Sequence, residues 1–425
     1  MNRRLIVFII VVLALTCGLT VPTYAGTPDD DYKPERYYIS NAAQQTTTLD
    51  AYDDNTNNAL TLTFTPPTDK DFIVIASALT NYETIDNSTI VRLALGPTVS
   101  PTGYSETYHQ PRDILLNWRG FGTHKILEAT GGISYTAKIQ YHAEVAGETA
   151  YIKRCAIAVL EVFNYENAES NGESTLTTSD YATGNKLTLG FTPGTEADYI
   201  IFATANMKNG TSGKGTLSEL TLNTVQDAEV EVVDTNYASY AYMEKETLSA
   251  ALKTFDINYK SEGTSTAYIK DARITAVLAD DFGDFYYAET EAEGDGTDLD
   301  YYDNDTNNKV TLTTDSLTIR NDYIVIGQGL GRQENVGKAF YANLDIDTTS
   351  YGEYVFESGD RALYRSFFIL TKVNLTIGSA HTVKIQYKTD TAGGSATAFV
   401  KNANIIAIKA NTVESYSTRR AYCHR

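Results

Sequence analysis

The chain has 425 residues, of which 42% are hydrophobic and 21% charged, so its composition fits two to four folded domains and excludes an intrinsically disordered protein. Its formal net charge of −20 argues against a nucleic-acid-binding protein, because such proteins need lysine and arginine to meet phosphates. Threonine and the 31 tyrosines favour the half-buried, pleated surface of a sheet, so we expect a mostly β protein.

Residues 1–25 have the pattern of a secretory signal peptide. Two arginines near the start precede an apolar run over 5–21, and Thr23 and Ala25 place small residues at positions −3 and −1 of a cut before Gly26. The sequence therefore predicts a protein exported from the cytoplasm, extracellular or at the cell surface.

Two alternatives to a cleaved signal stay open. The apolar run is nearly long enough to span a bilayer, so it could be retained as an anchor. A lipoprotein cut at Cys17 is the other alternative, although Thr16 is larger than the residue usual before such a cysteine. Cleavage after residue 25 would leave 32 basic and 54 acidic residues, a formal net charge of −22, and no further apolar segment of spanning length in the mature chain.

The chain repeats itself three times. LDAYDDNTNNALTLTFTP at 49–66 returns as LDYYDNDTNNKVTLTTDS at 299–316, and DYATGNKLTLGFTP at 180–193 is a middle copy. Further blocks recur in the same order: DFIVIASA, DYIIFATA and DYIVIGQG, then TAYIKRCAIAVL, TAYIKDARITAVL and TAFVKNANIIAI. The repeats are predicted over 46–165, 174–280 and 297–411.

Each repeat has the length of a β-sandwich, whereas solenoid units are shorter and cannot bury a core alone. Runs such as LTLTFT alternate with period two and are bounded by Gly, Asn and Pro. The predicted fold class is all-β, with three tandem β-sandwich domains that are jelly-roll-like or immunoglobulin-like; the sequence does not choose between these topologies. If the copies share one fold, two sets of residues should occupy equivalent positions, Asp71, Asp198 and Asp322, and Lys153, Lys270 and Lys401.

One strand pattern is unusual for a lone sandwich. Residues 72–75 read FIVI and are apolar on both sides of the strand, but a lone sandwich covers one face only. A neighbouring domain, a terminal segment or another subunit could cover the second face; the alternative is that Val and Ile tolerate exposure there.

The segments between the repeats differ in character. Residues 281–296 are rich in acidic residues and contain no lysine or arginine, so we expect an extended linker. Residues 162–174 are predicted to form a shorter and less acidic linker.

The repeated Asp/Asn-rich segment is a candidate Ca²⁺ site, because Ca²⁺ takes six to eight oxygen ligands from flexible loops. Its candidate ligands are Asp53, Asp54, Asn55, Asp303 and Asp305. The alternative is a plain turn before a strand, since Asp and Asn bond to their own backbone. The middle copy keeps only Asp180 and Asn185, which favours the turn. No other cofactor is predicted.

No catalytic residues are predicted. The five histidines, His109, His124, His142, His381 and His424, show no metal-binding spacing, and no hydrolase, zinc or phosphate-loop motif occurs. His381 aligns with Tyr135 and Lys253, a variation typical of a solvent-facing strand position. One active site does not need three copies of its scaffold, so we expect a protein that is not an enzyme.

Aromatic side chains raise carbohydrate binding as the alternative function. Tyrosine pairs at 37–38, 286–287 and 301–302 could stack on sugar rings. The other interpretation is β-propensity and linker packing, and the one tryptophan, Trp118, recurs in no other copy.

Cysteine and asparagine carry two further expectations. Cys155 aligns with Ala272 and Ala403 and is expected to be a buried small side chain, whereas Cys423 lies in the tail and could form an intermolecular bridge. Four glycosylation sequons are predicted to be surface positions: Asn87, Asn209, Asn304 and Asn374.

The two ends lie outside the predicted repeats. The extension 26–45 is acidic and could add as a strand to another subunit, and the tail 412–425 is basic. The candidate assembly residues are Asp29, Asp30, Asp31, Tyr37, Tyr38, Arg419, Arg420 and Tyr422. The predicted function is a structural surface protein, a subunit of an extracellular filament, surface layer or adhesive stalk that binds copies of itself head to tail. The alternative is a carbohydrate-binding adhesion protein with three β-sandwich modules.

Overall fold

The computed structural model describes residues 34–52, 57–84, 87–109, 118–223, 225–232, 235–296, 308–315, 321–335, 338–357, 364–376, 378–390 and 397–410. Regular structure in these ranges is antiparallel strand, apart from two short 3-10 helices, η1 (Tyr181–Thr183) and η2 (Ala279–Phe282). The predicted all-β fold is confirmed. No helix in the described ranges is long and apolar enough to cross a membrane.

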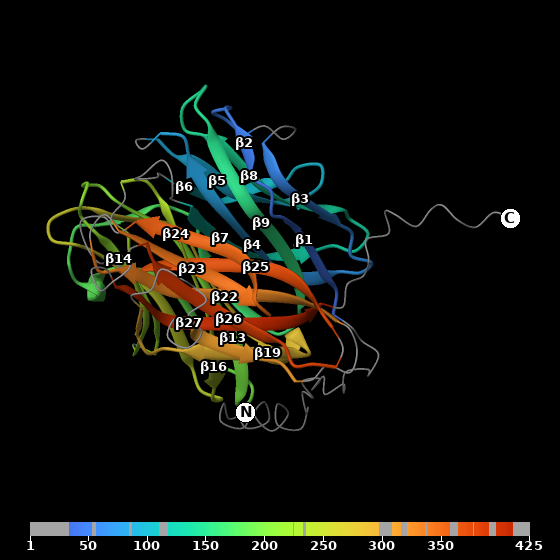
Figure 1. The fold of residues 1–425 in the computed structure, drawn as a ribbon. Helices are drawn as coiled ribbons and strands as arrows, with labels where there is room; N and C mark the ends of the chain where they lie inside the picture. Colours follow the sequence, from blue (N-terminus) through green and yellow to red (C-terminus); the bar gives the residue numbers. More distant parts are fainter. Residues whose placement is uncertain are drawn as a thin grey trace, which may run out of the picture. The chain divides into compact units, whose positions relative to one another are not determined.

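The first copy, blue to green in Figure 1, forms two sheets that we call inner and outer. Their orders are β1-β9-β4-β7, with β2 also paired to β9, and β3-β8-β5-β6. The inner strands are β1 (Arg36–Asn41), β2 (Gln45–Thr47), β4 (Lys70–Tyr82), β7 (Arg119–Ala129) and β9 (Ala150–Val162). The outer strands are β3 (Asn58–Phe64), β5 (Thr89–Pro97), β6 (Thr102–His109) and β8 (Tyr135–Ala143).

The second copy repeats this arrangement as β10-β18-β13-β16, with β11 paired to β18, and β12-β17-β14-β15. Its inner strands are β10 (Tyr165–Ser170), β11 (Ser174–Leu176), β13 (Ala197–Asn209), β16 (Ala238–Leu248) and β18 (Ala267–Leu278). Its outer strands are β12 (Asn185–Phe191), β14 (Thr216–Leu222), β15 (Val225–Val232) and β17 (Lys253–Ser261).

The third copy, orange to red in Figure 1, has the orders β19-β27-β22-β25, with β20 paired to β27, and β21-β26-β23-β24. Its inner strands are β19 (Phe285–Thr290), β20 (Gly294–Gly296), β22 (Asn321–Gln333), β25 (Arg365–Leu375) and β27 (Ala398–Ala410). Its outer strands are β21 (Asn308–Thr313), β23 (Ala339–Ile346), β24 (Thr349–Glu357) and β26 (Thr382–Thr389).

The order of the strands is that of a jelly roll. Among the eight long strands of the first copy, the first pairs with the eighth, the second with the seventh, the third with the sixth and the fourth with the fifth. Such a chain is one long hairpin rolled into two packed sheets of four. The structure therefore decides for the jelly roll over the immunoglobulin-like topology.

The register of the inner sheets confirms that the two predicted sets of residues are equivalent. Lys153, Lys270 and Lys401 each pair with the residue that lies eight positions after Asp71, Asp198 and Asp322, respectively. A bulge follows each lysine, because the next residue has a left-handed backbone, with φ of 52° at Arg154, 51° at Asp271 and 46° at Asn402.

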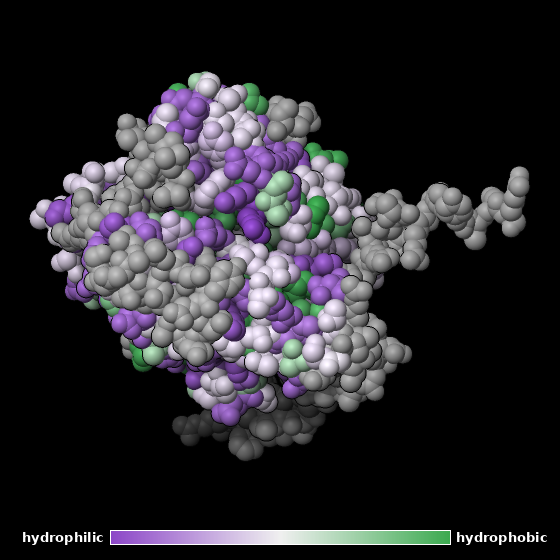
Figure 2. All heavy atoms as spheres, in the orientation of Figure 1, coloured by the Kyte–Doolittle hydropathy of each residue, from purple (hydrophilic) through white to green (hydrophobic). Residues whose placement is uncertain are grey.

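The second apolar face of each inner sheet is covered by the inner sheets of the other two copies. Residues that point away from their own sandwich gather in one buried cluster, the central core. It includes Ile73, Ile75, Ala158, Ile200, Phe202, Ala241, Met243, Phe282, Ile324, Ile326, Phe368, Leu370 and Ile406. Of the predicted covers, the neighbouring copy is the correct one, and the other sheet faces enclose three separate cores. The outside is different: Figure 2 shows a face that is mostly hydrophilic or intermediate, with small separate hydrophobic groups.

The prediction for the N-terminal extension is wrong where the structure describes it. Residues Arg36–Asn41 form β1, which pairs with β9 of the same chain from Arg36↔Leu160 to Asn41↔Cys155. The repeated motif used to place the first repeat contains β3, the second of the eight long strands, so β1, the first strand of the jelly roll, fell outside the predicted bounds.

The linker predictions also need correction. Within 281–296, Asp281 and Phe282 are buried in η2, and the following residues form β19 and β20, which pair with β27. Within 162–174, residues Tyr165–Ser170 form β10 on β18. Backbone pairing at the edge of the inner sheets thus outweighs the repulsion between carboxylates that we expected to extend the acidic segment.

Candidate functional site

Three equivalent backbone hydrogen bonds join the copies in a closed ring. Tyr108 N–H of the first copy donates to the Tyr237 carbonyl of the second over 2.7 Å. Glu231 N–H of the second copy donates to the Tyr364 carbonyl of the third over 3.0 Å, and Val355 N–H of the third donates to the Trp118 carbonyl of the first over 3.1 Å. The same contact therefore runs from first to second to third copy and back, and a repeated contact that closes produces a finite assembly.

The three acceptor residues, Trp118, Tyr237 and Tyr364, each stand directly before the inner strand β7, β16 or β25. Each ring carries the ammonium group of the equivalent lysine: Lys153 lies 3.8 Å from the centroid of Trp118, Lys270 lies 4.3 Å from Tyr237 and Lys401 lies 4.2 Å from Tyr364. Cation–aromatic attraction holds these aromatic side chains in place. It thereby also positions the backbone carbonyls of the same residues, which accept the hydrogen bonds that join the three copies. We call each lysine, its ring and the accepted N–H a closing contact.

The residue opposite each bulge lysine also reaches a neighbouring copy. Leu79 of the first copy is fully packed in the core of the third, and Leu330 of the third is packed in the core of the second. Asn206, the equivalent residue of the second copy, instead donates from Nδ2 to the Glu106 carbonyl of the first over 3.1 Å. Each copy therefore completes part of its neighbour.

The three inner sheets meet at Gly122, Ala241 and Phe368, which have equivalent registers in β7, β16 and β25. A Cβ atom added to Gly122 would lie 3.0 Å from the Cβ of Ala241 and 3.0 Å from the Cβ of Phe368. One large side chain fits at this point only because the other two are small.

Sequence reasoning missed the closing contacts. It noted the recurring lysines and Trp118, but compared tryptophan only with tryptophan. The available signal was the pattern of an aromatic residue three positions before another aromatic residue, which reads WRGF at 118–121, YASY at 237–240 and YRSF at 364–367.

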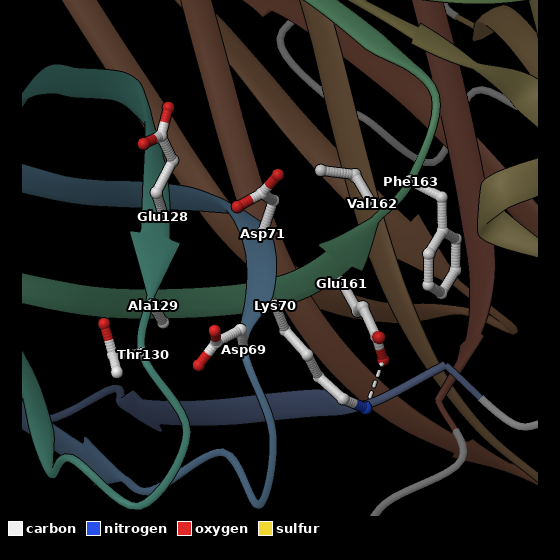
Figure 3. Close-up of a pocket in the computed structure, with 9 residues that line it drawn as sticks. All are labelled: Asp69, Lys70, Asp71, Glu128, Ala129, Thr130, Glu161, Val162 and Phe163. Atoms are coloured by element: carbon white, nitrogen blue, oxygen red, sulfur yellow. Dashed lines mark hydrogen bonds and ion pairs between the residues drawn. The ribbon is translucent and has the colours of Figure 1, made fainter.

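A second candidate site is an open depression of about 500 Å³ at one end of the first sandwich (Figure 3). Its lining comes from the start of β4 and the residue before it, and from the ends of β7 and β9 with the residue after each. The lining residues are Asp69, Lys70, Asp71, Glu128, Ala129, Thr130, Glu161, Val162 and Phe163. The Phe163 side chain is 49% exposed there.

The only lysine in the lining is engaged with two carboxylates. Lys70 Nζ lies 3.1 Å from Glu161 Oε2 and 2.9 Å from Glu35 Oε1. Asp69 accepts a hydrogen bond from Gly131 N–H over 2.8 Å, and Asp71 accepts one from the Tyr165 hydroxyl over 3.0 Å. The depression therefore presents acidic side chains beside an aromatic ring.

Comparison with the other copies shows how the depression became acidic. Asp198 is paired with Lys245 Nζ at 2.8 Å and Asp322 with Lys372 Nζ at 2.9 Å. The hydrogen bond from Lys245 lowers the pKa of the Asp198 carboxyl. At the equivalent place the first copy has Ile126, and Glu128 lies directly opposite Asp71 in the sheet. Like charges opposite one another are unfavourable, and the other two copies avoid them.

The candidate Ca²⁺ ligands Asp53, Asp54, Asn55, Asp303 and Asp305 lie outside the described residues. In the middle copy Asp180 is a cap: its carboxylate accepts from Ala182 N–H over 2.9 Å at the start of η1. The turn interpretation is therefore correct for that copy. Among the described residues no group of three or more His, Cys, Asp or Glu side chains could hold a metal ion.

The predicted sequons differ in accessibility. Asn374 is exposed in β25, and Asn87 is half-buried and donates to Glu148 over 2.9 Å. Asn209 is fully buried, with its Nδ2 bonded to the Gly215 carbonyl and to Ser265, so its prediction as a surface position is wrong. Asn304 lies outside the described residues.

The histidine and cysteine predictions have mixed outcomes. His381 is 5% exposed and bonds Asp347 and the Thr376 carbonyl, so the predicted solvent-facing position is wrong. Cys155 is fully buried as expected, and burial raises the pKa of its thiol to about 12. His124 is buried between the first and second copies, and Cys423 lies outside the described residues.

Most predicted assembly residues lie outside the described part of the chain, namely Asp29, Asp30, Asp31, Arg419, Arg420 and Tyr422. The other two are in β1: Tyr37 packs against Phe64 at a centroid distance of 4.9 Å, and Tyr38 packs against the central core. Tyr287 likewise bonds Lys245 N–H and Asn404. The pairs at 37–38 and 286–287 therefore pack within the chain, as the alternative to sugar stacking predicted, and the pair at 301–302 lies outside the described residues.

No protein-family model matches the chain, and no curated protein matches its sequence. Solved structures share only a partial likeness. PNGF-II has 8% identity and a TM-score of 0.27 over 80% of this chain and 99% of its own. The tandem CBM22 domains of Paenibacillus barcinonensis Xyn10C have 9% identity and a TM-score of 0.19 over 56% of this chain and 93% of their own. A triple jelly roll of an archaeal virus turret has 8% identity and a TM-score of 0.20 over 88% of this chain and 91% of its own. Likenesses this low assign no function.

Proposed function

We propose that this chain is a non-enzymatic structural protein of an extracellular surface, in which one polypeptide supplies a closed head of three jelly rolls. The observation that carries the proposal is the ring of equivalent contacts around a shared apolar core. A structural unit benefits from three copies of a scaffold, because they bury a large interface against one another. An enzyme needs only one active site and gains less from the repetition. The signal-like residues 1–25 support the extracellular place.

The ring changes how such a head would assemble. Head-to-tail contacts between the copies are used up within one chain, so filament growth cannot use them. Polymers, if formed, would use the outer sheets or the segments outside residues 34–410. Static light scattering and negative-stain microscopy of chain 26–425 test this proposal. Discrete heads, or arrays of such heads, support it; rapid turnover of a substrate by the purified chain, abolished by one point substitution, would replace it with an enzyme.

A second candidate is binding of a polyhydroxylated ligand such as a carbohydrate, and the depression of the first sandwich favours it. Carboxylates accept hydrogen bonds from hydroxyl groups, and the exposed ring of Phe163 can pack on the apolar face of a sugar. Binding of glycans by the intact chain should be lost on Phe163→Ala and Asp71→Asn. Leu252→Ala, at an exposed residue of the second copy, is the matched control and should bind normally. Binding that survives both depression variants would remove this candidate.

A further inference from the structure

The inner sheets of the three copies meet at three equivalent interfaces, which we call seams. One of these seams contains a buried histidine. His124 in β7 is 2% exposed. Its Nε2 lies 3.0 Å from Thr275 Oγ1 and its Nδ1 lies 3.3 Å from Thr204 Oγ1, and both threonines belong to the second copy. The side chain therefore bridges the first and second sandwiches.

The hydrogen bonds define a neutral imidazole. The Thr275 hydroxyl donates to Asn167 Oδ1 over 2.9 Å, so it is left to accept from Nε2–H of His124. Nδ1 is then the unprotonated nitrogen and accepts from the Thr204 hydroxyl. A second proton would have to enter at Nδ1, inside the seam.

The surroundings oppose a positive charge at this place. Phe202 on β13 lies 5.8 Å away between ring centroids. The charged groups near the imidazole are Lys125 on β7, Arg273 on β18, whose side chain is 1% exposed, and Glu169 on β10, which pairs with both cations. Burial, Arg273 and Lys125 lower the pKa of His124 to about 3.

The other two seams serve as internal references. Register places Met243 and Leu370 where the first copy has His124. At the position equivalent to Thr275, the first and third copies have Ala158 and Ile406. The position thus holds an apolar pair at two seams and a titratable, hydrogen-bonded pair at one.

We propose that His124 makes the seam between the first and second sandwiches acid-labile, so that proton uptake opens this seam while the other two remain closed. Opening returns the imidazole to water, where its pKa is about 6.5, so open seams bind a proton that closed seams reject. Well below pH 6.5 the opening equilibrium should then rise about tenfold per pH unit, and between pH 6.5 and 4.5 it should rise about 50-fold. The closing contact between Tyr108 and Tyr237 belongs to this seam and would part with it.

Native-state hydrogen exchange of the intact chain tests the proposal, with rates corrected for the intrinsic effect of pH. Protection of amides in β7, β6 and β13 should fall about 50-fold more between pH 6.5 and 4.5 in the wild type than in His124→Gln. Glutamine keeps a donor and an acceptor but does not titrate. Amides at the seam between second and third sandwiches should show no such difference.

Two further variants keep the test decisive. If His124→Gln does not fold, His124→Met with Thr275→Ala copies the apolar pairs of the other seams and should also lose the pH dependence. Glu169→Gln removes the nearby carboxylate and should weaken the seam at every pH while leaving the pH dependence in place. Equal loss of protection at all three seams, persistence of the effect in the His124 variants, or its disappearance in Glu169→Gln would each overturn the proposal.

Discussion

Phe368 shows at the scale of one residue how three copies of a sequence had to diverge. Its equivalents are Gly122 and Ala241, and a Cβ at Gly122 would already lie 3.0 Å from Phe368. Three identical large side chains cannot share one point, and three small ones would leave a cavity. The copies therefore became unequal where they meet.

We predict that Phe368→Ala lowers the free energy of unfolding by about 3–5 kcal/mol, because the two small neighbours cannot fill the cavity. Urea titration measures this loss. Phe163→Ala, at a ring that is 49% exposed, is the matched control and should cost less than about 1 kcal/mol. Equal losses in the two variants would contradict the packing we describe.

His381 predicts a pH dependence of stability in the third copy. Burial alone lowers the pKa of its imidazole, but hydrogen bonds to the Thr376 carbonyl and to Asp347, with the charge of Asp347, raise it overall. A raised pKa means that the stabilisation is fully present below the unfolded value of about 6.5 and is lost as the pH rises through the folded value.

The urea midpoint of the wild type should therefore fall between pH 6 and 9 by more than that of Asp347→Asn, which removes the partner. Asp284→Asn, which removes the partner of Lys409 and affects no histidine, should keep the wild-type slope. An unchanged slope in Asp347→Asn would assign the pH dependence to another group.

At the scale of elements, the anchoring of β1 decides whether the first sandwich is complete. Lys70 at the start of β4 joins Glu35, directly before β1, to Glu161 of β9, whose side chain is 1% exposed. Glu161 also accepts from Glu35 N–H over 2.6 Å. The first jelly-roll strand is thus held by charge at one end and by pairing along its length.

Lys70→Met should lower the free energy of unfolding by about 3 kcal/mol at pH 7, because it removes the ammonium group that pairs with the buried Glu161 carboxylate. Lys409→Met is the matched control, since its partner Asp284 has a side chain that is 75% exposed, and should cost at most about 1 kcal/mol. Denaturant titrations at pH 7 make the comparison; similar losses for both lysines would mean that the anchor contributes little.

At the scale of the whole molecule, the shared central core couples the three sandwiches. The three copies bury apolar surface against one another, so unfolding one copy exposes the inner faces of the other two to water and removes the stabilisation that their burial provides. We predict one cooperative thermal transition, with a calorimetric enthalpy close to the van't Hoff enthalpy. Three separable transitions would show that the copies behave as independent beads.

An isolated first copy tests the same coupling. A fragment over 34–162 keeps its own jelly roll but exposes Ile73, Ile75, Ala158 and Leu160 of the central core. It should self-associate or aggregate in size-exclusion chromatography with light scattering, because an exposed apolar sheet face of this kind is sticky. A stable, soluble monomer would contradict the shared core.

Recognition of the repeats needed no structure, because their motifs recur in one order and their strands alternate or run apolar in ways that local periodicity reveals. The short edge strands were harder to find. β1, β10 and β19 have few buried positions, and an acidic segment around β19 resembles a linker in composition. Such strands form because β9, β18 and β27 offer them unpaired backbone groups. Each of these partner strands lies more than a hundred residues later in the chain and comes close only after folding.

By itself the sequence determined the all-β class, the three copies and the equivalence of their lysines and aspartates, because these follow from residue type and spacing along one strand. It also showed that the strand at 72–75 has two apolar faces to cover. Only the tertiary structure decided what covers the second face, which aromatic rings close the ring of copies, and which histidine lies buried in a seam. Those outcomes depend on surfaces that meet from distant parts of the chain, and period-two patterning records that a face is buried but not which partner buries it.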